Sequence, residues 1–176
     1  MEHFYKTIEG WFTFPNLYKQ VVEKQQSEAH FVEVGSMQGQ SACYMAVEII
    51  NSNKNIKFDC VDTWGTGGSA KYKRFLKNTK SVQSIVNPIR LTSTEASNLY
   101  ADNSLDFVFI DANHSYKFIK DDIKHWYPKV KKGGILAGHD YWSDSPGVIQ
   151  AVDEFISKNN YSLEINSEYC WGFTKH

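Results

Sequence analysis

The sequence is poor in cysteine. It holds 3 cysteines in 176 residues, and Cys43, Cys60 and Cys170 show no C-x-x-C spacing. An odd number of cysteines without that spacing argues against a disulfide framework and against a structural zinc site. We therefore expect reduced thiols, as in a cytoplasmic protein.

Excess charge and long apolar runs are also lacking. The formal net charge is -1, whereas a domain that binds DNA or RNA is usually more basic, so no nucleic-acid partner is expected. No apolar run reaches membrane-spanning length, and Glu2 and Lys6 interrupt the segment where a secretory signal needs an unbroken apolar core. These absences predict a cytoplasmic protein without a membrane partner, and the length suits one domain over residues 1–176.

Segments of strand and helix character alternate along the chain. Strands are expected at 30–35, 56–62, 88–92, 105–111, 135–140, 161–166 and 169–175. Amphipathic helices are expected at 16–26, 41–53, 70–80, from about 115 to 127 and from 146 onward, with a turn at 131–134. Such alternation predicts an α/β fold with a mostly parallel sheet and helices on both faces.

The last two strands follow each other closely. Only Ser167 and Glu168 separate them, so they should pair as a C-terminal antiparallel hairpin. The predicted fold is therefore Rossmann-like, with a mostly parallel seven-stranded sheet covered by helices on both faces. Ligands of such sheets bind at the carboxyl ends of the strands, which makes the residues after each strand candidates for a site.

The first two strands end in residues that suit a nucleoside. Gly35 and Gly39 permit a tight turn and close backbone approach before a helix N-terminus. Their G-x-x-x-G spacing departs from the dinucleotide fingerprint G-x-G-x-x-G. Asp62 ends the second strand and can accept hydrogen bonds from both ribose hydroxyls. A glycine-relieved turn and a carboxylate that caps a loop are the structural alternatives.

The fourth strand, which reads as fully buried, ends in an acid and an imidazole. Asp111 and His114 follow it in "FIDANHSYK", and His139 and Asp140 end the fifth strand. Parallel strands bring their carboxyl ends to one edge, so these four side chains should lie near one another. A network that only orients loops is the structural alternative.

Several stretches occur together in an order typical of one family. They are "GWF", "FVEVGSMQGQSA", "VDTWGTGG", "LDFVFIDANHSY", "KKGGILAGHDY" and "YCWGF". In this order the sequence resembles the class I S-adenosylmethionine-dependent methyltransferases, and within them a small-molecule O-methyltransferase-like group. The resemblance implies a single methyltransferase domain over residues 1–176, in which the aromatic and helical segment 1–28 is a candidate lid.

The resemblance also implies where S-adenosylmethionine binds. The residues placed around its methionine moiety are Glu33, Gly35, Ser36, Gly39 and Ser41. Asp62 would take the ribose hydroxyls. Ser93 or Thr94 would lie near the adenine, where the family often has an acid that this sequence lacks.

In metal-dependent members of the group, an acid at the end of the fourth strand binds a divalent cation and a basic residue three positions later removes a proton. Asp111 and His114 stand in those places, and His139 and Asp140 stand where further ligands are expected. A hard cation lowers the pKa of a coordinated hydroxyl, and a His ligand shifts the choice from Mg²⁺ toward Mn²⁺. Alternatively no metal binds, and Asp111 contacts only the amino group of the cofactor.

The expected function is methyl transfer to a hydroxyl of a small molecule. A sugar, a catechol-like phenol and an amino sugar stay open as acceptors, as does the oligomeric state. Candidates for the acceptor pocket are Trp11, Phe12, Tyr141 and Trp142, and the glycine-rich loop 63–68 is a second candidate lid. The alternatives are a metal-independent O- or N-methyltransferase and a non-catalytic cofactor-binding domain of the same fold.

Overall fold

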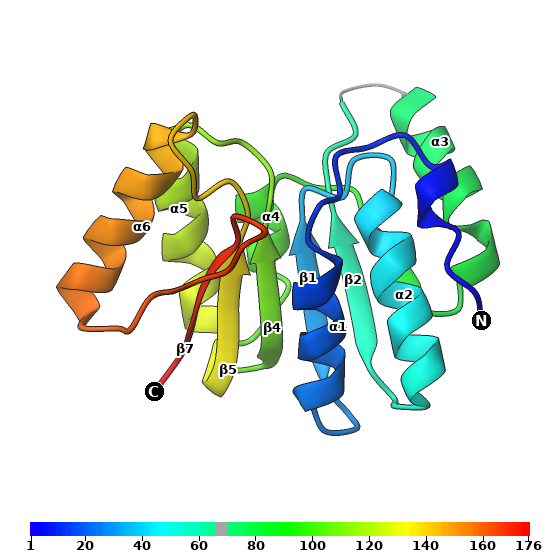
Figure 1. The fold of residues 1–176 in the computed structure, drawn as a ribbon, viewed down its shortest axis with the longest axis horizontal. Coiled ribbons are helices and arrows are strands. Elements are labelled where there is room, and N and C mark those ends of the chain that lie inside the picture. Colours follow the sequence, from blue (N-terminus) through cyan, green and yellow to red (C-terminus); the bar gives the residue numbers. More distant parts are fainter. Residues whose placement is uncertain (66–69) are drawn as a thin grey trace.

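The structure is a computed structural model that describes residues 1–65 and 70–176 (Figure 1). The strands are β1 (His30–Val34), β2 (Lys57–Val61), β3 (Val86–Ile89), β4 (Leu105–Ile110), β5 (Val130–Gly138), β6 (Glu164–Ile165) and β7 (Trp171–Thr174). The helices are α1 (Pro15–Lys24), α2 (Gln40–Ser52), α3 (Ala70–Asn78), α4 (Ser93–Ser97), α5 (Tyr116–Trp126) and α6 (Pro146–Asn159). Short 3-10 turns lie at Tyr5–Thr7, Lys80–Val82 and Tyr127–Lys129.

The strands form one 7-stranded sheet in the order β3-β2-β1-β4-β5-β7-β6. β1 to β5 run parallel to one another, while β7 runs antiparallel to both β5 and β6. Val34 pairs with Val61 on one side and with Ile110 on the other, so the three central strands end at the same level. The predicted mostly parallel sheet with a closing antiparallel hairpin is thus confirmed.

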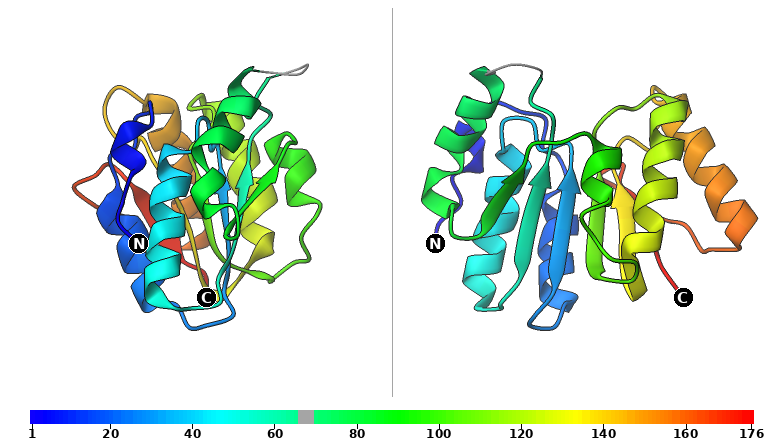
Figure 2. Two further views of the ribbon diagram at one scale, coloured as in Figure 1. Left: turned by 90° about the vertical axis from the view of Figure 1, so that its right-hand side faces the viewer. Right: turned by 180° about the vertical axis from the view of Figure 1, so that it is seen from behind.

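Helices cover both faces of the sheet (Figures 1 and 2). An apolar cluster lies beneath the helices on each face. On one face α1 and α2 cover Phe31, Phe58 and Phe107. On the other, α5 and α6 cover Val32 and Val108, the residues that alternate with the first set along the strands. Within the described residues no helix combines the length and apolarity that a membrane crossing requires. A cytoplasmic location stays a prediction of the sequence.

The C-terminal half departs from the expected elements at two places. Residues 131–134 were expected to form a turn, but β5 already begins at Val130, which pairs with Leu105 before the register shifts. Gly133 and Gly134 then exchange backbone hydrogen bonds with Lys175, which keeps this stretch within the sheet. β6 is shorter than expected, because only Glu164 and Ile165 pair with β7.

The N-terminal segment packs against the core through aromatic side chains. The Phe12 ring lies 5.1 Å from that of Tyr44 on α2, and the Phe14 ring lies 4.6 Å from that of Phe109 on β4. Gln40 at the start of α2 fixes the intervening backbone, since its side chain accepts from the Phe12 amide and donates to the Ile8 carbonyl, both at 2.9 Å. The action of the N-terminal segment as a lid stays a prediction.

A buried carboxyl group connects β1 to α1. Glu33 is 1% exposed, and the Tyr18 hydroxyl donates a hydrogen bond of 2.6 Å to its Oε2. Burial raises the pKa of Glu33 from its ordinary value of 4.5 to about 7, even though the hydrogen bond from Tyr18 acts in the opposite direction. The folded protein therefore holds this proton more tightly than the unfolded chain does.

This pKa predicts that wild-type stability falls as the pH rises from about 4.5 to about 7 and then levels off, because the unfolded carboxyl ionises first. Glu33→Gln removes the titration. Between about pH 5 and about pH 8 the wild type should lose on the order of 1–3 kcal/mol more unfolding free energy than Glu33→Gln. Urea unfolding of both proteins measures the difference, and parallel pH profiles would contradict it.

Candidate active site

A cavity of about 560 Å³ opens at the carboxyl ends of the parallel strands. Its walls come from the N-terminal segment, from the turn after β1, and from the residues that follow β2, β3, β4 and β5. This is the edge where a parallel α/β sheet is expected to bind its ligands.

The turn after β1 lies against the end of β4. Gly35 has φ +102°, and a Cβ added to it would lie 2.1 Å from the backbone oxygen of Asp111. The Asp111 amide in turn donates to the Val34 carbonyl at 2.8 Å. Only glycine permits this approach, so Gly35 brings the turn and Asp111 to one wall of the cavity.

Asp62 is held by backbone amides. Its Oδ2 accepts from the Met37 amide at 2.9 Å and its Oδ1 from the Trp64 amide at 2.6 Å. Trp64, which is 1% exposed, also donates its indole N–H to the Met37 carbonyl at 2.6 Å. Each carboxylate oxygen keeps further lone pairs, so Asp62 can accept additional hydrogen bonds from a ligand in the cavity.

Two buried oxygens near this turn, Ser36 Oγ and Glu33 Oε1, make no hydrogen bond of ordinary geometry with the described residues, although the hydroxyls of Ser36 and Ser41 lower the pKa of Glu33. Ser36 lines the cavity, whereas Glu33, three residues earlier in the chain, does not. Leaving such groups unpaired is costly, so they mark a place where a ligand with donor groups would be stabilised.

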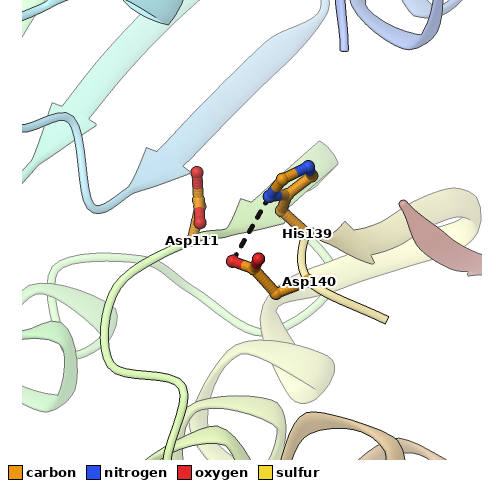
Figure 3. A group of neighbouring side chains, drawn as sticks. All are labelled: Asp111, His139 and Asp140. Atoms are coloured by element: carbon orange, nitrogen blue, oxygen red, sulfur yellow. Dashed lines mark ion pairs between the residues drawn. The ribbon is translucent and has the colours of Figure 1, made fainter. Parts of the chain in front are cut away.

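The ends of β4 and β5 bring two carboxylates and two imidazoles together. His114 Nε2 lies 3.4 Å from Asp111 Oδ1 and 3.1 Å from Asp140 Oδ2. His139 Nδ1 lies 3.3 Å from Asp140 Oδ2, the ion pair drawn in Figure 3. One ligand atom each from Asp111, His139 and Asp140 falls within 4.8 Å of the others, a grouping that could hold a metal ion.

The orientation of His139 suits a metal ligand. Its Nε2 lies 3.1 Å from the Glu168 carbonyl oxygen and 3.1 Å from Thr13 Oγ1. Since a carbonyl only accepts, Nε2 donates to Glu168 and Nδ1 faces Asp140. A protonated Nδ1 forms the ion pair with Asp140, and a deprotonated Nδ1 would offer its lone pair to a cation. The backbone of Asp140 itself is in the left-handed region, with φ +63°, a conformation that Asp tolerates better than most residues.

The charges in this cluster reinforce one another. The hydrogen bond to Asp111 raises the pKa of His114, against an opposing effect of burial, and the Asp140 charge raises it further. Burial would raise the pKa of Asp140, but its contacts with His139 and His114 outweigh burial and lower it. Asp140 is therefore ionised at neutral pH, as a cation ligand must be.

Most residues predicted from the sequence line the cavity. Those that do are Gly35, Ser36, Ser41, Asp62, Ser93, Asp111, His114, His139 and Asp140. Glu33, Gly39 and Thr94 do not line it. Gly39 instead leaves room for Phe75 and Thr79, and Thr94 is exposed, with its carbonyl accepting from Ser97.

Of the four residues predicted for the acceptor pocket, two line the cavity and two do not. Trp11 and Phe12 line the cavity, whereas Tyr141 and Trp142 do not. The Tyr141 hydroxyl donates to Asp153. The Trp142 indole donates to Asp140 Oδ1 at 3.2 Å, although Trp142 itself does not line the cavity. Residues 66–68 of the predicted loop lid lie outside the described part of the chain.

Sequence reasoning missed two residues that orient the site. Thr13 contacts His139, and Glu168 does so through its carbonyl while its carboxylate accepts from the amides of Asn16 and Leu17 at the start of α1. Thr13 lies in an irregular segment and Glu168 in the short connection of the hairpin, so no periodic pattern could have marked them.

Comparison with known proteins finds a matching family and similar solved structures. Residues 32–141 match the family described as "Methyltransferase domain". Among solved structures, the chain is similar to the O-methyltransferase NovP, with a TM-score of 0.72 at 18% identity over 92% of this chain and 78% of that one. It is also similar to precorrin-6y C5,15-methyltransferase from Geobacter metallireducens, with a TM-score of 0.70 at 14% identity over 92% of this chain and 88% of that one.

Two curated relatives match over shorter stretches. An uncharacterized protein of Sinorhizobium fredii is 27% identical over 115 residues, or 62% of this chain, and one of Acanthamoeba polyphaga mimivirus is 35% identical over 57 residues, or 31%. The matched stretches span only 13% and 26% of those proteins. The family match covers more than half of the chain. The chain therefore belongs to the methyltransferase domain family, with the fold of the class I S-adenosylmethionine-dependent methyltransferases.

Proposed function

We propose that this protein transfers a methyl group from S-adenosylmethionine to a hydroxyl of a small molecule, with the assistance of a divalent cation. One observation carries the proposal: the Asp62 carboxylate, the turn at Gly35 and the cluster around Asp111 and His114 all line the same cavity. This arrangement supports a nucleoside cofactor and a proton-accepting group that would both reach one reacting atom.

The proposed cofactor position follows from the donors and acceptors along the cavity wall. The ribose hydroxyls would donate to the Asp62 carboxylate, whose orientation two backbone amides fix. The ammonium of the methionine moiety would approach the Ser36 hydroxyl, which lines the cavity, with the buried Glu33 carboxyl near that serine. A positive charge there would also favour the ionised form of Glu33. Buried polar atoms without a partner thus support a cationic, donor-rich ligand.

Asp111, His139 and Asp140 are the residues that would hold the cation. Two carboxylates and one imidazole suit Mn²⁺, and Mg²⁺ less well because of the nitrogen ligand. The contact of His139 Nε2 with the Glu168 carbonyl would keep Nδ1 directed at the ion. When bound, such a cation supplies charge that lowers the pKa of an acceptor hydroxyl.

His114 is the proposed base. His114 lines the cavity and its side chain is 44% exposed, so it can reach a ligand. Asp111 and Asp140 contact its Nε2 and can orient the ring. In the transfer, a bond forms between the acceptor oxygen and the methyl carbon while the bond from that carbon to sulfur breaks. The hydroxyl proton passes to His114, and S-adenosylhomocysteine leaves. Alignment and exclusion of water are the remaining tasks of the protein.

The acceptor is proposed to be small and to meet the N-terminal segment. Trp11 is 81% exposed and Phe12 is partly buried, and both line the cavity. Exposed aromatic rings offer a flat apolar face to a ligand ring. The similarity to NovP, which is named an O-methyltransferase, supports oxygen as the methylated atom.

Metal binding is tested with the variant Asp140→Asn. The matched control is Asp144→Asn, which makes the same change at an exposed residue of the same loop. Calorimetric titration with MnCl₂ should show binding to the wild type and at least roughly tenfold weaker binding to Asp140→Asn, because a ligand charge is lost. Asp144→Asn should stay within about twofold of the wild type. Equal Mn²⁺ affinities, or no binding to the wild type, would favour the metal-independent alternative.

The base is tested by His114→Gln. Formation of S-adenosylhomocysteine with sugar, catechol and amino-sugar acceptors should slow about 10²- to 10⁴-fold, because proton removal is lost. Affinity for S-adenosylhomocysteine should change by less than about threefold, since the proposed contacts of His114 are with the acceptor. His125→Gln is the control, because that ring bonds to the Asp121 carbonyl within α5. Unchanged turnover would remove His114 from the mechanism, and no wild-type turnover would favour a non-catalytic domain.

A further inference from the structure

A second hollow lies between the N-terminal segment and the end of α3, two parts of the chain that lie side by side (Figures 1 and 2). Its volume is about 550 Å³, and it shares no described lining residue with the cavity of the candidate active site. Its described walls are formed by Phe4, Thr7 and Ile8 from the N-terminal segment, and by Lys77, Asn78, Lys80, Ser81 and Gln83 from α3 and the turn that follows it.

The hollow carries positive charge without negative charge. Lys77 and Lys80 line it, and none of its described lining residues is acidic. Both lysines are exposed, and neither side chain forms a hydrogen bond or an ion pair with another described residue. Two ammonium groups that face one hollow repel each other, and an anion between them would turn that repulsion into attraction.

The positive charge extends around the hollow. Residues 70–94 contain six of the 19 basic residues of the chain and none of its 20 acidic residues. The other residues, which hold 13 basic and 20 acidic side chains, are therefore acidic overall. Arg74 lies 3.7 Å from Glu9, and Arg90 donates to two backbone carbonyls, so these two cations are already engaged. Such an uneven charge distribution attracts anions to this end of the molecule.

The other lining residues suit a small phosphate-bearing ligand. The volume falls within the range of small-molecule pockets. A lysine ammonium binds phosphate as a point charge, and the Ser81 hydroxyl and the Gln83 amide can donate further hydrogen bonds to phosphate oxygens. Phe4 and Ile8 add an apolar wall on the opposite side. Charge, donors and volume thus agree on a compact anion.

The hollow is connected to the active-site cavity through the N-terminal segment. Residues 4–8 contribute to the hollow, and residues 9–12 contribute to the cavity. Gln40 joins the two stretches, because its side chain donates to the Ile8 carbonyl and accepts from the Phe12 amide. A ligand that bridges both walls of the hollow would therefore also stabilise the segment where it lines the cavity.

We propose that this hollow is an effector site for a small molecule with a phosphate or pyrophosphate group, which Lys77 and Lys80 bind. The bound anion links α3 to the N-terminal segment and thereby stabilises the wall of the active-site cavity. The anion site itself is independent of the proposed function, whereas its effect on the cofactor rests on the proposed binding of S-adenosylmethionine. Because coupling between two sites is reciprocal, each ligand should strengthen the binding of the other.

The site is tested by calorimetric titration with pyrophosphate, with divalent cations absent. The wild type should bind it, and the double variant Lys77→Gln/Lys80→Gln should bind at least about tenfold more weakly, because two charge-assisted contacts are lost. The matched control is Lys71→Gln/Lys73→Gln, which removes the same charge from exposed positions of the same helix outside the hollow. At physiological salt the control should stay within about threefold of the wild type, because distant exposed charges are screened.

Two further titrations identify the source of the phosphate and the coupling. Uridine 5′-diphosphate carries the same group on a nucleoside, so tighter binding than pyrophosphate indicates a nucleotide, and weaker binding indicates a free anion. With saturating pyrophosphate the wild type should bind S-adenosylhomocysteine about fivefold or more tightly than without it. The variant Lys77→Gln/Lys80→Gln should show no such gain.

The outcomes separate the two proposals. Absence of pyrophosphate binding to the wild type, or equal losses in the two double variants, would overturn the anion site. An unchanged affinity for S-adenosylhomocysteine with pyrophosphate bound would overturn the effector role. If the wild type bound pyrophosphate but never S-adenosylhomocysteine, the proposed function would fail while the anion site stood.

Discussion

The site depends on the close contact between the turn after β1 and the end of β4. Gly35 lies so near the Asp111 backbone that no side chain could be added to it, and both residues belong to central strands that end at one level. The contact fixes the spacing between the two halves of the cavity. Any residue larger than glycine would have to separate β1 from β4 and with them those halves.

The order of the strands places two different sets of side chains in the two halves of the cavity. β2 and β3 present Asp62 and Ser93, which suit a nucleoside, while β4 and β5 present the carboxylates and imidazoles that suit proton transfer and a cation. The N-terminal segment closes the cavity over both halves, and its Thr13 contacts His139 directly. The electrostatics follow from the same arrangement, because contacts with His139 and His114 stabilise the charged form of Asp140.

The sequence predicted the sheet and the strand-end residues, because hydrophobic periodicity and the carboxyl-end rule are local or topological properties. It could not predict that Asp122, a helix residue with an ordinary amphipathic setting, is buried against Ser93, or that the Glu168 carbonyl meets His139, since such contacts depend on tertiary packing. The prediction of a turn at 131–134 was wrong for the same reason, because Gly133 and Gly134 form backbone hydrogen bonds with Lys175, more than forty residues later.

The central claim is that one cavity holds the cofactor beside a cation. A crystal structure with S-adenosylhomocysteine and Mn²⁺ tests it most directly. The account predicts ribose hydroxyls on Asp62, and anomalous density for manganese between Asp111, His139 and Asp140. Cofactor bound elsewhere, or manganese absent from that cluster while the cofactor is in place, would contradict it.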